Sequence, residues 1–322
     1  MVTLDDIRQA QRRVQGVAHR TPLVLCPHHA QDRVLYFKPE NLQPIGSFKL
    51  RGAYNMIASL REEERRRGVI SYSSGNHAQG VAYAARALGV KSTIVMPRNA
   101  PQIKLDSTAG YGAEIVLVGP ASSERKARAE ELAREHGYVI IPPYNDERII
   151  AGTGTIGLEI LEDLPQIETV LVPIGGGGLI SGVAAALKLS KPAVKVIGVE
   201  PELAADAQDS CRAGRIVEFT AEQVTRTLAD GLRTQSVGPI NFEHIRRYVD
   251  DVVTVSEDEI VQAVRRMAQN AKLVAEPSGA VTFAAYLFHR DHLPPAKTHV
   301  AVVSGGNLEP ALLAKILTGR SG

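Results

Sequence analysis

Residues 172–182 read VPIGGGGLISG and hold the longest run of glycines in the chain. An apolar, β-branched segment precedes the run, TVLVPI at 169–174, and a helix-like apolar segment follows it, LISGVAAALKL at 179–189. A strand that passes through glycines into a helix suits an anion, because free backbone N–H groups and the positive end of the helix dipole meet at the turn. The stretch therefore predicts a phosphate-binding loop within an α/β fold.

Strand-like runs alternate with helix-like segments on both sides of this loop. Upstream the runs are GVISY (68–72), STIVMP (92–97), EIVLV (114–118) and YVIIPP (138–143); downstream they are KVIGVE (195–200), DVVTV (251–255) and THVAVVS (298–304). Short apolar strands separated by helices predict parallel sheets. For a chain of 322 residues we expect two α/β domains, a small one of residues 56–144 and a large one formed by residues 1–55 and 145–322.

The composition excludes several classes of protein. The 37 basic and 35 acidic residues leave a net charge of +2, too little to favour nucleic acid or an anionic membrane. No apolar run approaches the roughly 20 residues that span a bilayer, and the first residues, MVTLDDIRQAQRRVQG, lack the apolar segment of a secretory signal. Cys26 and Cys211 support neither a disulfide framework nor a zinc site. We expect a cytoplasmic protein whose partners are small molecules.

The glycine loop does not match the two commonest nucleotide motifs. It lacks the Lys-Ser/Thr ending of a P-loop, and Ile180 stands where a dinucleotide fingerprint requires its third glycine. A literal G-x-G-x-x-G occurs at Gly152, Gly154 and Gly157, but no strand run leads directly into it. Glu200 closes the next strand about where a ribose-binding acid would stand. A nicotinamide-dependent oxidoreductase therefore stays a distant alternative.

A second candidate segment, ENLQPIGSFKLRGA at 40–53, places a lysine at the start of a helix. Gly46 and Ser47 predict a cap for a helix that begins at Phe48 and Lys49. A cation in the first turn opposes the helix dipole, which lowers its pKa and favours the neutral, nucleophilic amine. On its own, though, the segment fits a surface lysine better.

Two further turns carry polar side chains directly after strand runs. In ISYSSGNHAQG at 70–80 they are Ser73, Ser74, Asn76 and His77, and in AVVSGGNLEP at 301–310 it is Ser304. Backbone and hydroxyl donors at a helix start suit a carboxylate, but ordinary turn chemistry explains the first turn equally well. The sequence of each turn alone does not show which function it has. Taken alone, His77 is interpreted as a structural histidine.

Taken together and in this order, the segments resemble the fold-type II pyridoxal-phosphate enzymes, in the branch of serine racemase and the serine/threonine dehydratases. SFKLRGA, SSGNH, the glycine run and SGGN are joined by AGTGTIGLEI, VEPELAAD, TLADGL and EPSG, so that the likeness spans about residues 20–310. The resemblance implies a tryptophan synthase β-like fold, with two three-layer, parallel-sheet domains and pyridoxal 5'-phosphate in the cleft between them. It also implies a homodimer.

The same resemblance implies a set of cofactor-binding residues. Lys49 would be the Schiff-base lysine, Phe48 and Asn76 would flank the ring, and Ser304 would face the pyridine nitrogen. A hydroxyl there does not enforce a protonated pyridine, so the ring is a weaker electron sink, as suits elimination. The phosphate would be held by the backbone N–H groups of Gly175, Gly176, Gly177, Gly178 and Leu179.

The activity that the resemblance implies is dehydration of a β-hydroxy amino acid to a 2-oxo acid and ammonia. Ser73, Ser74, Asn76 and His77 would bind the substrate, and the amine of Lys49 would remove the α-proton. Threonine-specific relatives commonly have Ala where Ser74 stands, whereas racemases have Ser, so an amino-acid racemase that uses Lys49 and Ser74 on opposite faces is the alternative. Serine, threonine and 3-hydroxyaspartate all stay open as substrates.

The resemblance also implies a divalent cation. In VEPELAAD, Glu200 and Asp206 match an acidic pair that binds such an ion with the backbone carbonyl of Ala204. Oxygen ligands suit Mg²⁺, and also Mn²⁺ or Ca²⁺. Without the resemblance, the two carboxylates fit a solvated loop.

Overall fold

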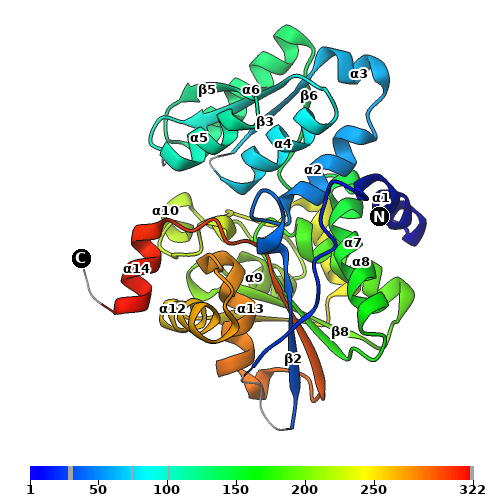
Figure 1. Ribbon diagram of the computed structural model, residues 1–322, viewed down its shortest axis with the longest axis vertical. Helices are drawn as coiled ribbons and strands as arrows, with labels where there is room; N and C mark the ends of the chain where they lie inside the picture. The colour runs from blue at the N-terminus through cyan, green and yellow to red at the C-terminus, as the bar shows by residue number, and fades with distance from the viewer. Residues whose placement is uncertain (28–31, 74, 101, 320–322) are drawn as a thin grey trace.

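Two β-sheets organise the chain in the computed structural model, which describes residues 1–27, 32–73, 75–100 and 102–319 (Figure 1). The smaller sheet, at the top of Figure 1, has the order β5-β4-β3-β6 and is parallel throughout. The larger sheet has the order β1-β2-β10-β7-β8-β9 and is parallel except where β1 pairs with β2. The predicted α/β fold with two parallel sheets is confirmed.

Most of the predicted strands form where the apolar runs lie. The small sheet consists of β3 (Val69–Tyr72), β4 (Ser92–Pro97), β5 (Glu114–Val118) and β6 (Val139–Ile140). The large sheet consists of β1 (Val24–Leu25), β2 (Val34–Pro39), β7 (Thr169–Pro173), β8 (Lys195–Pro201), β9 (Asp251–Val255) and β10 (Thr298–Val303). The sequence did not reveal β1 or β2, and β6 is shorter than its run because prolines without an N–H group follow it.

Helices cover the sheets and connect their strands. They are α1 (Leu4–Val14), α2 (Lys49–Ala58), α3 (Glu62–Arg67), α4 (Asn76–Ala87), α5 (Gln102–Gly110), α6 (Ser122–His136), α7 (Glu147–Asp163), α8 (Gly178–Ser190), α9 (Asp206–Ala213), α10 (Ala221–Val224), α11 (Pro239–Tyr248), α12 (Glu257–Arg266), α13 (Pro277–Phe288) and α14 (Pro310–Thr318). Short helical turns are η1 (Glu40–Leu42), η2 (Glu202–Ala204), η3 (Asp230–Leu232), η4 (Met267–Ala271) and η5 (Arg290–His292). Within the described ranges, none of the helices combines the length and apolar character needed to cross a membrane.

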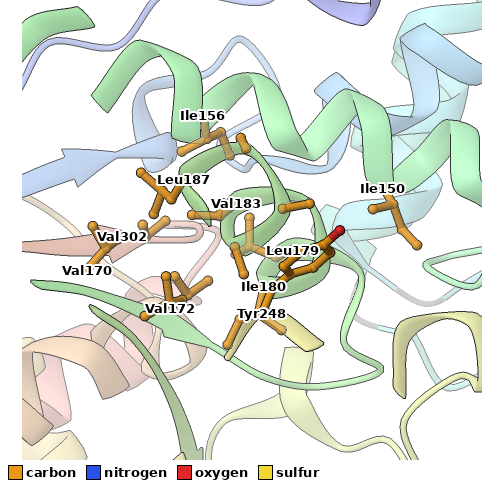
Figure 2. Close-up of a cluster of buried hydrophobic side chains, with 14 of the residues drawn as sticks. Ile150, Ile156, Val170, Val172, Leu179, Ile180, Val183, Leu187, Tyr248 and Val302 are labelled. Atoms are coloured by element: carbon orange, nitrogen blue, oxygen red, sulfur yellow. The ribbon is translucent and has the colours of Figure 1, made fainter. Parts of the chain in front are cut away.

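The hydrophobic core of the large unit lies on both faces of its sheet. On one face, α8 packs against α7 and the sheet, with Val183 and Leu187 buried beside Ile156 and Val170 (Figure 2). On the other face, α12 and α13 cover a second buried cluster. This burial of apolar surface, about 25 cal/mol per Å², keeps the carboxyl ends of β7 and β10 in fixed positions.

Helix α2 connects the two units because it packs against α4 on one side and α7 on the other. A Cβ atom added to Gly152 of α7 would lie 2.6 Å from the Arg51 carbonyl oxygen and 2.7 Å from the Gly52 Cα atom. The two helices therefore approach backbone to backbone, which no larger residue at position 152 would allow. Since α2 contacts both units, the limits of 56–144 for the small domain stay a prediction.

The predicted cap of α2 is wrong. Ser47 pairs with Gly305 in an isolated β-bridge, and its buried hydroxyl has no hydrogen-bond partner in the described part of the chain. Phe48 takes the N-cap position with helical dihedral angles, and its N–H group donates to the carbonyl oxygen of Ser304 at 3.0 Å. The segment after β10 thus stands where a capping side chain was expected.

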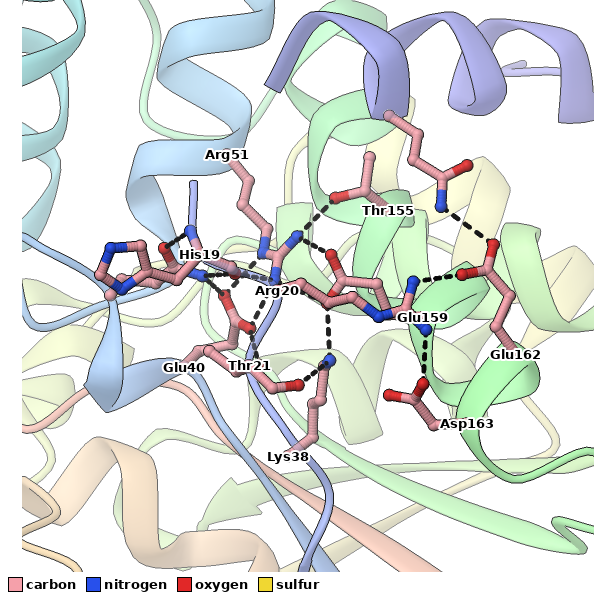
Figure 3. A network of polar contacts seen from close by, with 12 residues as sticks. His19, Arg20, Thr21, Lys38, Glu40, Arg51, Thr155, Glu159, Glu162 and Asp163 are labelled. Carbon is pink, nitrogen blue, oxygen red and sulfur yellow. Dashed lines mark hydrogen bonds and ion pairs between the residues drawn. The ribbon is translucent and has the colours of Figure 1, made fainter. Parts of the chain in front are cut away.

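A buried ion network fixes the start of α2 to the large unit (Figure 3). The fully buried Arg51 donates to Glu40 at 2.7 Å and to Glu159 at 2.6 Å. Lys38 of β2 donates to the same Glu159 at 2.6 Å and to the Thr21 carbonyl oxygen at 2.7 Å. Burial acts to raise the pKa of Glu40, but the Arg51 guanidinium outweighs it and holds this pKa below its ordinary value. Two cations and two carboxylates therefore neutralise one another.

We expect Arg51→Leu to lower the free energy of unfolding by about 3–5 kcal/mol, because it leaves two carboxylates buried without their guanidinium partner. Arg20→Leu is the matched control: Arg20 pairs with Glu162 and Asp163 at the surface, and such pairs contribute about 1 kcal/mol or less. Urea unfolding of both variants measures the difference. Equal losses in the two variants would show that burial of the network does not matter.

Candidate active site

Several predicted site residues meet between the two units. Lys49 donates from Nζ to the Pro143 carbonyl oxygen at 2.7 Å, and a Cβ on Gly80 of α4 would lie 3.2 Å from the Lys49 carbonyl. The residue after Pro143, Tyr144, lies against the glycine loop. The turns after β3 and β10 also meet here, because Asn307 donates to Asn76 at 2.7 Å.

Lys49 is the first residue of α2 and is only partly exposed. Burial lowers the pKa of its amine to about 8. Its Nζ atom lies 5.1 Å from the centre of the Phe48 ring, and no carboxylate in the described ranges pairs with it. A lysine with a lowered pKa and no ionic partner is suited to act as a nucleophile or base at neutral pH.

One glycine of the loop adopts a left-handed turn conformation, and two others lie in close contact with Tyr144. Gly177, at φ +89°, is left-handed and forms the N-cap of α8. A Cβ on Gly178 would lie 2.8 Å from the Cβ of Tyr144, and one on Gly176 would overlap the Tyr144 ring. In the described chain, the N–H groups of residues 175–179 donate to no other group. The loop therefore offers the row of free backbone donors that an anion requires.

The turn after β3 presents further donors. The Ser73 hydroxyl accepts a hydrogen bond from the Gly75 N–H group at 3.2 Å, and Asn76 begins α4. His77 is buried, and its Nε2 atom donates to the Ile141 carbonyl oxygen at 3.0 Å. Burial and the nearby Lys49 charge lower the pKa of His77 to about 3, so it is neutral. Ser74, the predicted acid/base, lies outside the described residues.

A buried carboxyl group that the sequence did not single out lies beside Ser304. Glu276 is 4% exposed and accepts a hydrogen bond from Asn76 at 2.7 Å. A Cβ on Gly305 would touch this carboxyl, and Ser304 itself is buried with its hydroxyl 3.3 Å from the Ser278 carbonyl oxygen. Burial, then the charge of Asp230, raises the pKa of Glu276 to about 8. The sequence motif EPSG contains Glu276, but it contributed only to the family resemblance and gave this residue no role.

An ion pair also joins the two units. Lys104 of α5 donates to Asp230 of η3 at 2.8 Å, and a Cβ on Gly75 would lie 3.7 Å from the Lys104 Nζ atom. A cation therefore lies beside the turn of Ser73 and Asn76. The sequence did not predict this pair, because no pattern in it joins α5 to η3.

The predicted metal ligands come together at the end of β8. Glu200 is fully buried and accepts hydrogen bonds from the Ala207 and Gln208 N–H groups at 3.0 and 2.9 Å. Asp206 is fully buried too, and neither of its carboxylate oxygens has a hydrogen-bond partner among the described residues. Burial raises the pKa of Asp206 to about 7, and burial together with the Asp206 charge raises the pKa of Glu200. Ala204, 1% exposed, ends η2 next to them.

The literal G-x-G-x-x-G does not form a nucleotide-binding turn. Gly152, Gly154 and Gly157 all lie inside α7, buried against neighbouring helices. They permit close helix packing, since a Cβ on Gly157 would lie 2.8 Å from the Val183 carbonyl oxygen of α8. This removes one of the two sequence features that left a nicotinamide-dependent oxidoreductase open.

Comparison with known proteins finds one family model, "Pyridoxal-phosphate dependent enzyme", which matches residues 14–305. An L-threonine ammonia-lyase of Thermotoga maritima is 47% identical over 98% of this chain and 78% of that protein. An L-threo-3-hydroxyaspartate ammonia-lyase of Saccharomyces cerevisiae is 41% identical over 99% of this chain and 97% of its own. The structure of maize serine racemase superimposes with a TM-score of 0.92 at 38% identity, covering 99% of this chain and 97% of that one.

The raised pKa of Glu276 predicts a pH dependence of stability. An unfolded glutamate loses its proton near pH 4.5, whereas the folded protein keeps this one until about pH 8. Unfolding therefore releases a proton in that window, and the stability of the wild type relative to Glu276→Gln should fall by roughly 2–4 kcal/mol as the pH rises through it. Urea unfolding at half-unit pH intervals measures the difference; parallel curves would contradict it.

Proposed function

The chain belongs to the family of pyridoxal-phosphate-dependent enzymes that contains the threonine dehydratases and serine racemases, and we propose that it deaminates β-hydroxy amino acids as an ammonia-lyase. The observation that carries this proposal is the identity of 47% over 98% of the chain with an L-threonine ammonia-lyase. The site supports it, because a half-buried lysine, a loop of free N–H groups and a turn whose donors suit a carboxylate lie together.

The residues present fit pyridoxal phosphate. The free N–H groups of residues 175–179 suit its phosphate, and Lys49, whose only hydrogen bond in the described chain goes to the Pro143 carbonyl, can bind its aldehyde. Phe48 and Asn76 would flank the ring, and the Ser304 hydroxyl would face its nitrogen. When bound, the cofactor withdraws electrons from the substrate α-carbon.

The side chains then have separate tasks. Ser73, with the N–H groups of Asn76 and His77, would hold the substrate carboxylate at the start of α4, where the helix dipole favours an anion. The imidazole of His77 adds no charge, because it is neutral and occupied by Ile141. The Lys49 amine, with its pKa near 8, would take the α-proton, and loss of the β-hydroxyl leads to a 2-oxo acid and ammonia.

The ion pair of Lys104 and Asp230 bears on the choice of substrate. A dicarboxylic substrate such as 3-hydroxyaspartate needs a cation near the turn that holds its α-carboxylate, and Lys104 stands beside Gly75 in that turn. Its attraction to Asp230 competes with a second carboxylate on the substrate. We propose that threonine and serine are substrates and that 3-hydroxyaspartate, the substrate in the name of the yeast relative, binds by displacing Asp230.

Proton NMR in D₂O tests the reaction. With pyridoxal phosphate and Mg²⁺, L-threonine, L-serine and threo-3-hydroxyaspartate should each yield a 2-oxo acid and ammonia, and Lys49→Ala should lose the near-visible absorption band and at least about 10³-fold in rate. D-serine is measured in the same tube. Substantial D-serine from L-serine would favour the racemase that the maize structure and Ser74 suggest. A wild type without the absorption band would contradict the proposed function altogether.

We also propose that Glu200, Asp206 and the Ala204 carbonyl bind a divalent cation. The described residues contain no cluster of three or more His, Cys, Asp or Glu side chains suited to a metal, so the site needs a backbone ligand. Two fully buried carboxylates, one of them without any hydrogen bond in the described chain, support it, because an unpaired buried charge is costly unless a cation compensates it. Oxygen donors favour Mg²⁺, Mn²⁺ or Ca²⁺.

Removal of this ion should destabilise the protein. We expect a chelator to lower the melting temperature and Mg²⁺ to restore it, since saturation at about 100 times the dissociation constant contributes about 2.7 kcal/mol. Asp206→Asn should abolish the response, whereas Asp209→Asn, on the same helix, should retain it. Differential scanning calorimetry measures both, and a wild type indifferent to the chelator would exclude the ion.

We propose the cytoplasm as the location, because two cysteines far apart in the sequence offer no disulfide framework. A homodimer stays a prediction from the family resemblance.

A further inference from the structure

A chain of three side chains crosses from the small unit to the large one beside Ser304. Asn307, after β10, donates from Nδ2 to the Ile45 carbonyl oxygen at 2.8 Å and to Asn76 Oδ1 at 2.7 Å. Asn76, at the start of α4, donates from its own Nδ2 to Glu276 at 2.7 Å. The two links between side chains are short, and they join residues 200 and 231 positions apart in the sequence.

The direction of these hydrogen bonds, from donor to acceptor, cannot be reversed. A backbone carbonyl only accepts hydrogen bonds, so the Ile45 oxygen requires the nitrogen of Asn307. Both N–H bonds of that nitrogen are then used, and Asn76 must present its oxygen to them. The Asn76 nitrogen consequently faces Glu276, and one of its two N–H bonds has no partner in the described ranges.

Two glycines keep these three hydrogen-bonded side chains in place. A Cβ on Gly46, at φ +71°, would overlap the Asn307 amide, and a Cβ on Gly305 would overlap the Glu276 carboxyl and lie 3.2 Å from the Asn76 nitrogen. The side chains thus fill the space that these glycines leave. The glycines of GSFK and SGGN are accounted for by packing against this chain as well as by turn geometry.

We propose that Asn307 and Glu276 are positioning residues, which fix the Asn76 amide so that its remaining N–H bond donates to an acceptor on the bound cofactor ring. This rests on the proposed cofactor site. Because the partners of Asn76 belong to the large unit and Asn76 to the small unit, the donor is in place only when the two units are held together as they are here.

Asn307→Asp tests the proposal by removing the N–H donors without changing the shape. The Asn76 amide should then turn round, with its nitrogen toward the new carboxylate and its oxygen toward Glu276, which is protonated below about pH 8. We expect the full-length variant to bind pyridoxal phosphate about tenfold more weakly, the effect of one lost hydrogen bond, and to show a shifted near-visible band. Glu276→Gln keeps an acceptor oxygen and should retain affinity and band.

Asn41→Asp is the matched control for the added charge. Asn41 also donates to a backbone carbonyl, Val274 at 2.9 Å, and lies near Gly306, but it is not part of the chain. Asn307→Ser, without a new charge, replaces Asn307→Asp if the latter does not fold, with weaker cofactor binding expected again. Wild-type affinity and spectrum in the variant at position 307, or an equal loss in Asn41→Asp, would overturn the proposal; a wild type that takes up no cofactor would instead refute the proposed function.

Discussion

The pairing of Arg51 with two buried carboxylates is the constraint on which the site depends. Arg51 lies two residues after Lys49, so the guanidinium that holds Glu40 and Glu159 also holds the first turn of α2. Buried ion pairs contribute little net stability against an apolar core, but they are costly to leave half made. The network therefore specifies one position for α2 between the units, and with it one position for the lysine amine.

The fixed position of α2 buries the ionisable groups of the site, and exclusion of water from them shifts their pKa values. Lys49, His77 and Glu276 each have pKa values shifted toward the neutral form, to about 8, 3 and 8, and burial is the largest cause each time. Burial thus acts against charge on every one of these groups between the sheets. In a site of that kind the charges of a bound substrate and cofactor would dominate, and the free N–H groups of the glycine loop are the donors that we propose for the cofactor phosphate.

The sequence predicted the parts of this structure that depend on short segments. The place of the glycine loop between a strand and a helix, the apolar strands from β3 to β10 and the fold class all follow from local patterns, and they are confirmed. Phosphate binding by the loop stays a prediction. What it did not predict depends on contacts between distant segments. Strand β2 was missed because Lys38 interrupts its apolar run, and the buried Lys38 has its partners in Glu159 and the Thr21 carbonyl oxygen. The predicted helix cap at Ser47 was wrong for a similar reason, because Ser47 pairs with Gly305 from a distant segment. The roles of Glu276, Lys104 and Asp230 were hidden because their partners lie 200 and 126 residues away.

The position of β10 between β2 and β7 has a consequence for how the chain matures on the ribosome. The strands of the small sheet all come from one continuous stretch, and β3, β4 and β5 pair in the order in which they emerge, so this sheet can assemble during synthesis. The large sheet cannot, because its interior strand is the last to emerge, and β2 must wait about 260 residues for it. Until then β2 and β7 expose unpaired edges, and Ser304 and Asn307, carried at the end of β10, are absent. Ser304 and Asn307 can therefore reach Phe48 and Asn76 only after β10 has been inserted between β2 and β7.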